Sequence, residues 1–387
     1  MKKLLMVANC TICPVINGAR KRMYNLIRLF EKAGCEVQVV ISNDKVGYMS
    51  TQEGMPNNKI YFFDSDRKKT VLATKRAELR EKMSIDMLKF YSVPYMLDDA
   101  FPHGLDDFVT ELHQKERFDF VIAEYIYMSK ALTKLGDDVT KIIDTVDIFA
   151  GREKMYYGMG TKPGNFYTTR HQERKGMMRG DYIFAIQKEE SKYFHRLTRG
   201  KRRVVTIGDY LNVPGNTINY GKNVLFVGSN NDPNREALHY FLNNIWGKVH
   251  NKVPDAQFMI AGDVSNSVKE SPDYIKVGYV EDLADIYKEA RVVVNPMLSG
   301  TGLPIKTIEA MAYGKPVVAT ASGARGLYKE GREPRALVLA KDTDVFISKL
   351  IRILDDDKEV ERVHHNCERF IERYNDRLFK KIKSVVK

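Results

Sequence analysis

The segment from Asn295 to Thr320 carries residues whose types and spacing suit the binding of a phosphate group. Small residues fill positions 299 to 302 after a predicted strand, Pro304 suits the first turn of a helix, and Gly314 suits its end. This geometry exposes backbone N–H groups at the start of a helix. Such groups bind phosphate together with the positive end of the helix dipole. The segment therefore predicts a phosphate site.

Two charged side chains of the predicted helix add to this chemistry. Lys306 lies in the first turn and supplies a full positive charge, and Glu309 lies one turn further along, where it can accept hydrogen bonds from ribose hydroxyls. Taken singly, the loop can also be a simple tight turn and Glu309 an exposed helix residue. The pattern of the whole segment decides in favour of a site.

The run from Gly300 to Thr320 fits the pattern G-x-G-[IL]-x-x-K-x-x-E-A-M-A-x-G-x-P-V-V-A-T. This run resembles the donor-binding region of family-four glycosyltransferases, which have the GT-B fold and take a sugar from a nucleotide-diphosphate donor. The resemblance implies that the donor is bound by the residues of the loop and the helix, namely Ser299, Gly300, Thr301, Gly302, Leu303, Lys306 and Glu309.

The resemblance extends upstream and covers residues 222 to 326. Asn223 to Asn234 looks like the first strand and loop of the family's donor domain, where Gly228 and Ser229 would lie close to the diphosphate. In the family, the backbone of a Gly-Tyr-Val run contacts the nucleotide base, and here this run ends in Tyr279 and Val280.

Two departures from the family pattern concern charge. Many members have a second glutamate eight positions before the ribose-binding one, but Thr301 stands there. Sugar contacts are therefore expected from the backbone N–H groups of 300 to 303. Many members also place an Arg and a Lys after the first strand of the domain, whereas this chain has only Arg235 in that region. Lys306 and Arg235 are left to neutralise the diphosphate.

The first half of the chain resembles the family more weakly. Gly18, on a predicted strand-to-helix loop, would let the backbone approach a substrate closely. Glu124 and Asp147 follow predicted strands, where a carboxylate can orient an acceptor hydroxyl or stabilise positive charge on the donor sugar. These two are the candidate catalytic residues. The alternative for both is structural capping, and relatives often have a His in the region of Glu124.

The elements that must position these residues form two series of alternating strands and helices. Each series predicts a doubly wound α/β domain, and ligands bind at the carboxyl ends of the strands in such sheets. Strands are expected at 4–8, 37–41, 118–123, 141–146 and 181–186 in the first series, and at 223–228, 256–261, 274–278, 291–295, 316–320 and 336–340 in the second. Helices are expected at 19–33, 234–248, 281–290, 304–313 and 342–354.

We therefore expect the α/β GT-B architecture, in which two Rossmann-like domains face a central cleft. The first domain spans 1–212 on the acceptor side, with a helical insertion at 64–116, and the nucleotide-sugar-binding domain spans 213–356. A charged helix at 357–387 is expected to pack back on the first domain. The polar, breaker-rich residues 212–219 have the composition of a linker.

The composition of the chain limits the classes of partner that we expect. The net charge of +12 favours phosphates, acidic glycans or anionic lipid heads, and much of it lies in 67–82, 152–179 and the tail from 371, which can also be solvated helix faces. The chain has no signal-peptide core and no stretch long enough to cross a bilayer, so we expect a cytoplasmic protein, in peripheral contact with the inner membrane face at most.

Other chemistries have weaker support. No cluster of residues has metal-ligand spacing, so neither a metal nor a cofactor is expected beyond the donor itself. Cys10 and Cys13 have the spacing of a thiol redox loop, but the rest of the chain is unlike such a protein.

The sequence thus predicts a metal-independent hexosyltransferase of polysaccharide or glycoconjugate biosynthesis, retaining by resemblance. Its acceptor would be a glycan, a lipid-linked or a protein-linked hydroxyl, and nucleic acid is not an expected partner. Two alternatives stay open: a nucleotide-sugar epimerase or hydrolase of the same fold, and a basic binding protein that uses the fold as a scaffold.

Overall fold

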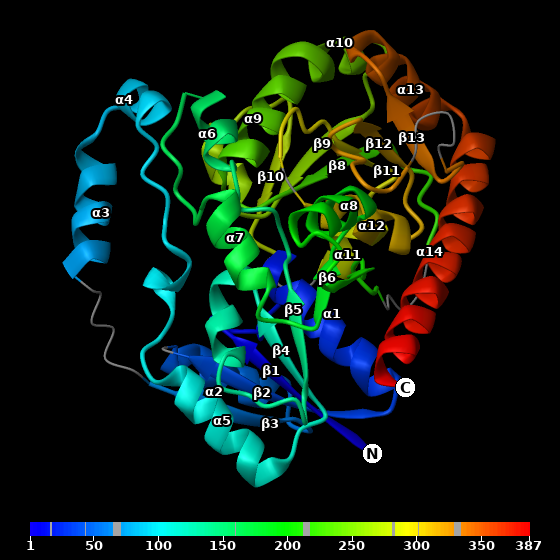
Figure 1. The fold of residues 1–387 in the computed structure, drawn as a ribbon. Helices are drawn as coiled ribbons and strands as arrows, with labels where there is room; N and C mark the ends of the chain where they lie inside the picture. The colour runs from blue at the N-terminus through cyan, green and yellow to red at the C-terminus, as the bar shows by residue number, and fades with distance from the viewer. Residues whose placement is uncertain are drawn as a thin grey trace. The chain divides into compact units, whose positions relative to one another are not determined.

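The computed structural model describes residues 1–15, 18–42, 44–64, 71–158, 160–211, 217–280, 283–300, 302–328 and 334–387. The chain divides into two compact units (Figure 1). Unit 1 consists of Met1–Asp209 together with Phe379–Lys387, and unit 2 is Tyr210–Leu378. Each unit has a parallel sheet covered by helices, so the predicted α/β class with two doubly wound domains is confirmed.

Unit 1 contains a seven-stranded sheet in the order β3-β2-β1-β4-β5-β6-β7, in which every described pairing is parallel. The centre of this sheet is apolar on both faces, as in β1, where Leu4 to Ala8 are fully buried. The strands are β1 (Lys2–Ala8), β2 (Cys35–Ser42), β3 (Lys59–Phe63), β4 (Phe120–Glu124), β5 (Thr140–Asp144), β6 (Tyr182–Ala185) and β7 (Arg203–Thr206).

The helices of unit 1 supply the crossovers between these strands. The sequence did not predict the two edge strands, β3 and β7. The helical elements of this unit are α1 (Gly18–Lys32), α2 (Lys45–Gly54), α3 (Val71–Lys82), α4 (Ile85–Phe90), η1 (Leu97–Ala100), α5 (Leu105–Glu116), η2 (Ile126–Leu132), α6 (Glu153–Gly158), α7 (Arg170–Met177) and α8 (Lys188–Leu197).

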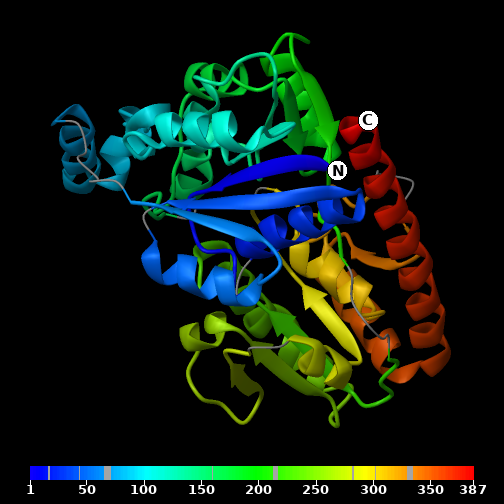
Figure 2. The ribbon, with the colours of Figure 1, turned by 90° about the horizontal axis from the view of Figure 1, so that it is seen from below.

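The expected insertion at 64–116 holds α3, α4, η1 and α5 in its described part. In both ribbon views α3 and α4 project beyond the sheet of unit 1, while α5 lies against it (Figures 1 and 2). Residues 65–70, which precede α3, lie outside the described residues.

Unit 2 contains a six-stranded parallel sheet in the order β10-β9-β8-β11-β12-β13. All six strands were predicted, because each is a short apolar run between helical segments. They are β8 (Asn223–Val227), β9 (Gln257–Ala261), β10 (Ile275–Gly278), β11 (Val292–Asn295), β12 (Val317–Thr320) and β13 (Leu337–Ala340). The helical elements are α9 (Asp232–Phe241), η3 (Leu242–Trp246), α10 (Gly247–His250), η4 (Asp263–Ser267), α11 (Leu283–Glu289), α12 (Ile305–Ala312), α13 (Thr343–Asp355) and α14 (Asp357–Val386).

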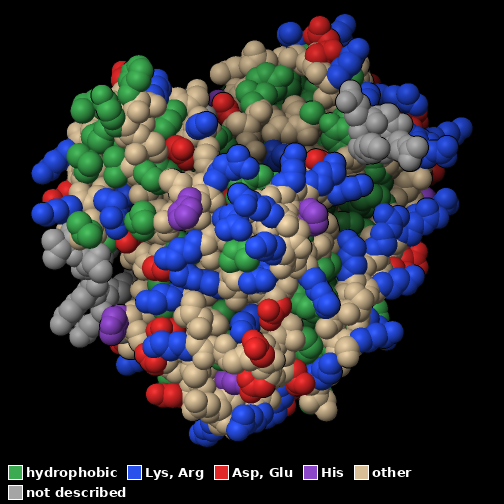
Figure 3. All heavy atoms as spheres, viewed as in Figure 1, with side chains coloured by type: hydrophobic (Ala, Val, Ile, Leu, Met, Phe, Trp, Pro, Cys, Tyr) green, Lys and Arg blue, Asp and Glu red, His purple; other side chains and the backbone are tan. Residues whose placement is uncertain are grey.

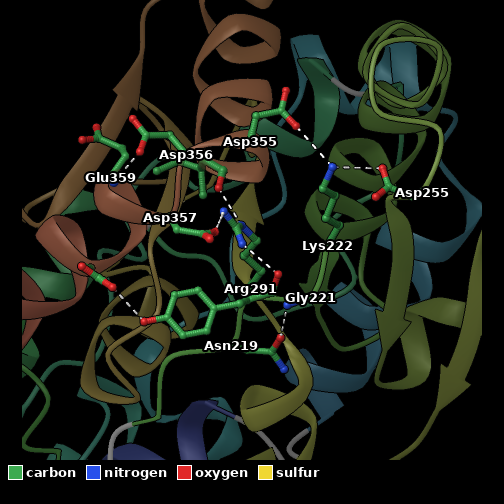
Figure 4. Close-up of polar contacts among 12 residues, drawn as sticks. Asn219, Gly221, Lys222, Asp255, Arg291, Asp355, Asp356, Asp357 and Glu359 are labelled. Carbon is green, nitrogen blue, oxygen red and sulfur yellow. Dashed lines mark hydrogen bonds and ion pairs between the residues drawn. The ribbon is translucent and has the colours of Figure 1, made fainter.

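A buried arginine anchors the start of α14 within unit 2 (Figure 4). Arg291 donates from Nε to the carbonyl of Ile353 at 2.7 Å and from Nη1 to the carbonyl of Tyr220 at 2.9 Å, and pairs with Asp357 at 2.7 Å. The contacts join the segment before β8, the start of β11 and the junction of α13 with α14. The last residues of α14, 379–387, group with unit 1, where Lys381 bonds the carbonyl of Thr206.

Candidate functional site

The loop after β11 is held in place by a buried set of hydrogen bonds. The Asn295 side chain donates to Thr307 Oγ1 at 2.7 Å and to the carbonyl of Gly323 at 3.0 Å, and the Thr307 hydroxyl donates to the same carbonyl at 2.7 Å. A Cβ on Gly323 would lie 2.2 Å from the Asn295 carbonyl oxygen, so this close approach requires glycine. The end of β11, the first turn of α12 and the turn after β12 are therefore fastened together.

Glycines shape the loop itself. Gly300 and Gly302 have φ values of 138° and 70°, which side chains rarely adopt. Pro304 then precedes α12, and Leu303 is buried beside it. Thr301 lies outside the described residues. The sequence expectation of a small-residue loop leading into a helix start thus agrees with the described geometry around it.

Lys306 extends from the first turn of α12 to the neighbouring loop of unit 2. Its Nζ donates to Asn234 Oδ1 at 2.7 Å and lies 4.6 Å from the centroid of the Phe226 ring. Burial lowers the pKa of this amine to about 7, because low-polarity surroundings disfavour the charged form. An anion placed beside it would restore the charge.

Asn234 links Lys306 to the loop after β8. Its amide donates to the carbonyl of Ser229 at 2.8 Å, and its backbone N–H is capped by Asn231 at the start of α9. The adjoining Gly228 is also tightly packed, because a Cβ on Gly262 would lie 2.3 Å from the Gly228 carbonyl oxygen. The structure therefore brings the predicted residues Gly228, Ser229 and Lys306 together, through an asparagine that the sequence analysis did not single out.

Arg325 is a second residue that the sequence analysis missed. Its Nε donates to the carbonyl of Gly302 at 2.9 Å, and its Nη1 donates to the carbonyl and the hydroxyl of Ser322 at 2.9 and 2.8 Å. A Cβ on Gly300 would lie 3.0 Å from Arg325 Nη2, so the guanidinium lies against the glycine loop. Many family members have an Arg and a Lys after the strand that corresponds to β8, and this chain does not. That difference could have indicated that a basic residue from elsewhere in the chain approaches this loop.

Arg235, the other cation that was expected to neutralise the diphosphate, contacts residues near the start of its own helix. Arg235 pairs with Asp232 on its own helix and donates to Asn230 Oδ1 at 2.8 Å, and its side chain is 39% exposed. The hydroxyl of the predicted Ser299 donates to Glu236 Oε2 at 2.8 Å. Arg235 therefore belongs to the rim of this loop cluster, whereas Lys306 and Arg325 lie at its centre.

Glu309 and the predicted base contacts lie on other elements of the same unit. Glu309 is 5% exposed on α12 and adjoins Tyr287, whose pKa is raised well above its ordinary value by burial and by this nearby negative charge. At the end of β10, Tyr279 is 55% exposed and Val280 is half-buried. Gly278 has a φ of 77° and its carbonyl accepts from the N–H of Gly262 at 2.6 Å.

In unit 1 the candidate catalytic residue Glu124 lies in the interior. The residue ends β4 as predicted, but its side chain is fully buried, and its pKa is raised well above the ordinary value by burial and by the adjacent Asp144. Arg22 donates to both oxygens of Asp144 at 2.8 and 2.9 Å. Burial thus favours the protonated form of Glu124, and its catalytic role stays a prediction.

Asp147 lies in the loop after β5 and is half-buried. It pairs with Arg152 at 3.1 Å. The preceding Val146 has a φ of 56°, and Tyr125, just after β4, has a φ of 66°, which are strained values for residues with side chains. Strain of this kind is common at functional sites, and these two residues follow neighbouring strands of the sheet. Gly18 begins α1, where the sequence analysis placed the strand-to-helix loop.

Three further findings bear on the alternatives. Across the residues described, no group of three or more His, Cys, Asp and Glu side chains could hold a metal ion. No helix among them has the length and apolar character to span a bilayer. Burial raises the pKa of Cys10 to about 11 and raises that of Cys13, so the reactive thiolate of a redox loop is disfavoured at both positions.

Comparison with known proteins agrees with the motif. Residues 221–356 match the model of the glycosyl transferases group 1 family. The chain is 28% identical over 142 residues to UDP-Gal:alpha-D-GlcNAc-diphosphoundecaprenol alpha-1,3-galactosyltransferase of Escherichia coli, a match that covers 34% of this chain and 35% of that protein. It is 29% identical over 167 residues to an uncharacterized 44.6 kDa protein in the cps region of Klebsiella pneumoniae, covering 40% and 42% of the two chains. The matches thus span less than half the length of these curated relatives.

Solved structures resemble the fold over the whole chain. TarM from S. aureus, in complex with fondaparinux, alpha-GlcNAc-glycerol and UDP, aligns with a TM-score of 0.69 at 11% identity and covers 99% of each chain. HepE from Anabaena, in complex with UDP and glucose, aligns with a TM-score of 0.65 at 12% identity and covers 99% of this chain and 100% of its own. Residues 221–356 therefore correspond to the domain of the group 1 glycosyltransferases, and the chain has a GT-B fold.

Proposed function

We propose that the protein transfers a hexosyl group from a UDP-sugar to a hydroxyl of a lipid-linked glycan acceptor. The sugar-diphosphate part of this proposal is supported by the loops of unit 2 around Gly300 and Ser229. The glycine loop leads into the start of α12, and Lys306 and Arg325 provide the basic side chains there. The TarM and HepE structures contain UDP, and the relative from Escherichia coli is named for UDP-Gal and a diphosphoundecaprenol acceptor. Transfer with retention follows from the family resemblance.

The diphosphate would be bound by backbone N–H groups of 300 to 303, by Lys306 and by Arg325. Lys306 would regain its proton beside the phosphates, and the guanidinium of Arg325, which contacts the glycine loop, would add a second positive charge. When the bond between the sugar and the diphosphate breaks, negative charge accumulates on the leaving diphosphate. Fixed positive groups that are already in place stabilise this charge in the transition state, and they can do so without a metal ion.

The rest of the donor would be recognised by residues on neighbouring elements. Glu309 would accept hydrogen bonds from the ribose hydroxyls, and the backbone of Tyr279 and Val280 would contact the base. Gly228 and Ser229 would approach the diphosphate from the end of β8. These roles follow from the family resemblance and agree with the placement of the residues in unit 2.

On the acceptor side we propose Asp147 as the carboxylate that orients the acceptor hydroxyl. Its side chain is half-buried beside Arg152, in a loop with a strained neighbour, whereas Glu124 is fully buried, which favours its protonated form. We assign Glu124 a structural role in the buried group around Asp144. A general base needs an ionised carboxylate within reach of the hydroxyl, and Asp147 lies 3.1 Å from the positive charge of Arg152, which favours the ionised form.

The observation that carries the proposal is the buried Lys306 amine beside the loop after β8, together with Arg325 against the glycine loop that precedes α12. Calorimetric titration with UDP, GDP, ADP and their sugars tests it, using the wild type, the Lys306→Ala and Glu309→Ala double variant, and Lys288→Ala as a matched control on an exposed helix of the same unit. Saturable binding of uridine nucleotides, lost in the double variant and kept in the control, supports the proposal. Absence of binding by every nucleotide would refute the donor site.

A transfer assay then separates the reaction classes. Incubation with the bound UDP-sugar and a lipid-linked acceptor should release UDP only when the acceptor is present. Free sugar released without an acceptor would indicate a hydrolase, and a changed sugar on intact UDP would indicate an epimerase.

A further inference from the structure

The helices α3 and α4 of unit 1 carry an unusual concentration of exposed apolar side chains. Leu72 and Leu79 on α3 are 66% and 49% exposed, and Met87, Phe90 and Tyr91 on or next to α4 are 52%, 84% and 72% exposed. We name these five residues the α3–α4 patch. Figure 3 shows hydrophobic side chains gathered at the upper left, where Figure 1 places α3 and α4. Large apolar side chains on a soluble surface are usually scattered singly, so such a gathering indicates a surface that binds something.

The spacing of the patch follows the helix period. Met87, Phe90 and Tyr91 stand at positions i, i+3 and i+4 and therefore share one face, and Leu72 and Leu79 stand two turns apart on α3. Leu88, the residue after Met87, is 1% exposed. Both helices thus bury one apolar side chain, Ala73 on α3 and Leu88 on α4, and leave larger ones exposed to solvent.

The inner side of this hairpin is firmly attached to unit 1. Arg76 pairs with Asp99 at 2.6 Å, and the Arg80 guanidinium lies 3.6 Å from the centroid of the Tyr95 ring and bonds the carbonyl of Val93 at 3.2 Å. These contacts fix which face points inward. The outward apolar face is therefore a stable feature of the unit.

The excess of positive charge near the patch comes from a neighbouring segment. On the two helices themselves the exposed Lys75, Lys82 and Lys89 are balanced by the exposed Glu78, Glu81 and Asp86. The basic segment 152–179 lies alongside, because Lys162 donates to the carbonyl of Glu81 at 2.8 Å and Tyr167 donates to the carbonyl of Val93 at 2.9 Å. That segment adds further exposed cations, namely Lys154, Lys162, Arg170 and Lys175.

We propose that the α3–α4 patch docks the protein on an anionic lipid membrane. Apolar and aromatic side chains with cations nearby are the combination that binds a membrane interface, since the apolar tips enter the headgroup region and the cations attract anionic lipids. The chain's net charge of +12 acts in the same direction. Docking would give the protein access to a lipid-linked acceptor, and this benefit rests on the proposed function. Docking itself requires neither a bound donor nor sugar transfer.

Vesicle flotation tests the docking. The wild type should float with vesicles that contain about a third anionic phosphatidylglycerol and remain unbound with pure phosphatidylcholine. The Met87→Ser, Phe90→Ser, Tyr91→Ser triple variant should lose at least tenfold of the binding. The matched control is Val46→Ser with Met49→Ser, which removes two apolar side chains that are 78% and 53% exposed on α2 of the same unit, and it should bind like the wild type.

Two further measurements, UDP binding and tryptophan emission, distinguish a loss of docking from a loss of folding. UDP binding by calorimetry should be unchanged in the triple variant, which shows that the variant is folded and separates failure of docking from failure of the donor site. In a Phe90→Trp variant, a blue shift of tryptophan emission with anionic vesicles would report insertion directly, against the single buried Trp246 of the native chain.

Three results would overturn the proposal. The first is equal vesicle binding by the wild type and the triple variant. The second is no emission shift of the introduced tryptophan together with no flotation. The third is a vesicle-independent dimer that the triple variant abolishes, which would make the patch an interface between two copies.

Discussion

Donor binding should depend on pH through Lys306. In the free protein the pKa of this amine is lowered to about 7 by burial, so at pH 8.5 it is largely neutral. A bound diphosphate stabilises the charged form and raises that pKa. A UDP-sugar is the right probe, because each phosphate of its diester carries one negative charge throughout this range.

The direction and size of this pH dependence follow from the linkage between proton binding and donor binding. Binding favours the protonated amine, so affinity is fully present below the pKa of the free protein and falls as pH rises above it. If the pKa in the complex exceeds 9, the dissociation constant should rise about 30-fold from pH 6 to pH 8.5, which is a loss of ~2 kcal/mol at ~1.4 kcal/mol for each pKa unit. Nearly one proton should be taken up for each donor bound at pH 8.5.

Calorimetry in two buffers of different ionisation enthalpy measures both quantities. Lys306→Arg, whose side chain stays charged, should give a flat profile, and Lys306→Met should give weak binding that is also flat. Lys288→Met, on an exposed helix of the same unit, should keep the wild-type profile. A wild-type dissociation constant that changes less than threefold over this range, without proton uptake, would refute the assignment of Lys306 to the diphosphate.

The remaining predictions concern the loop cluster, the packing of unit 2 and the buried acid of unit 1. Arg325→Ala should weaken UDP-sugar binding by about ten- to a hundredfold in calorimetry, since charge-assisted hydrogen bonds contribute ~1.5–3 kcal/mol, and unchanged binding would exclude it from the site. Gly262→Ala should lower the free energy of unfolding by about 2–4 kcal/mol in urea titration, because φ is 89° and the added Cβ would lie 2.3 Å from the Gly228 carbonyl oxygen. Gly247→Ala, whose Cβ would meet nothing within 4 Å on a helix, should be neutral or stabilising. Glu124→Gln should be at least as stable as the wild type at pH 8 in thermal melts. The pKa of Glu124 is raised in the folded state, so ionisation of this carboxyl favours the unfolded state once the pH rises above the ordinary pKa of a glutamate. If Glu124 is instead a catalytic carboxylate, the substitution should lower kcat more than a hundredfold.

The donor motif could be read from the sequence because its parts are close together along the chain. Gly300, Gly302, Lys306 and Glu309 lie within one loop and the first turns of one helix, so local geometry relates them. The strands of both sheets were predictable for a similar reason, since a parallel strand buried on both faces is a continuous apolar run. The edge strands β3 and β7 were missed, because each is short, begins with an exposed basic residue and is only partly buried.

Only the tertiary structure decided which charged groups are buried and which distant side chains meet. Arg325 reaches the glycine loop from the turn after β12, and Asn234 joins Lys306 from another helix. The lowered pKa of Lys306 and the raised pKa of Glu124 depend on burial, which the sequence does not specify residue by residue. The sequence by itself determined the fold class and the location of the candidate donor site, because both follow from local patterns. Charge states and long-range contacts depend on how the elements pack, and so were settled only in the folded chain.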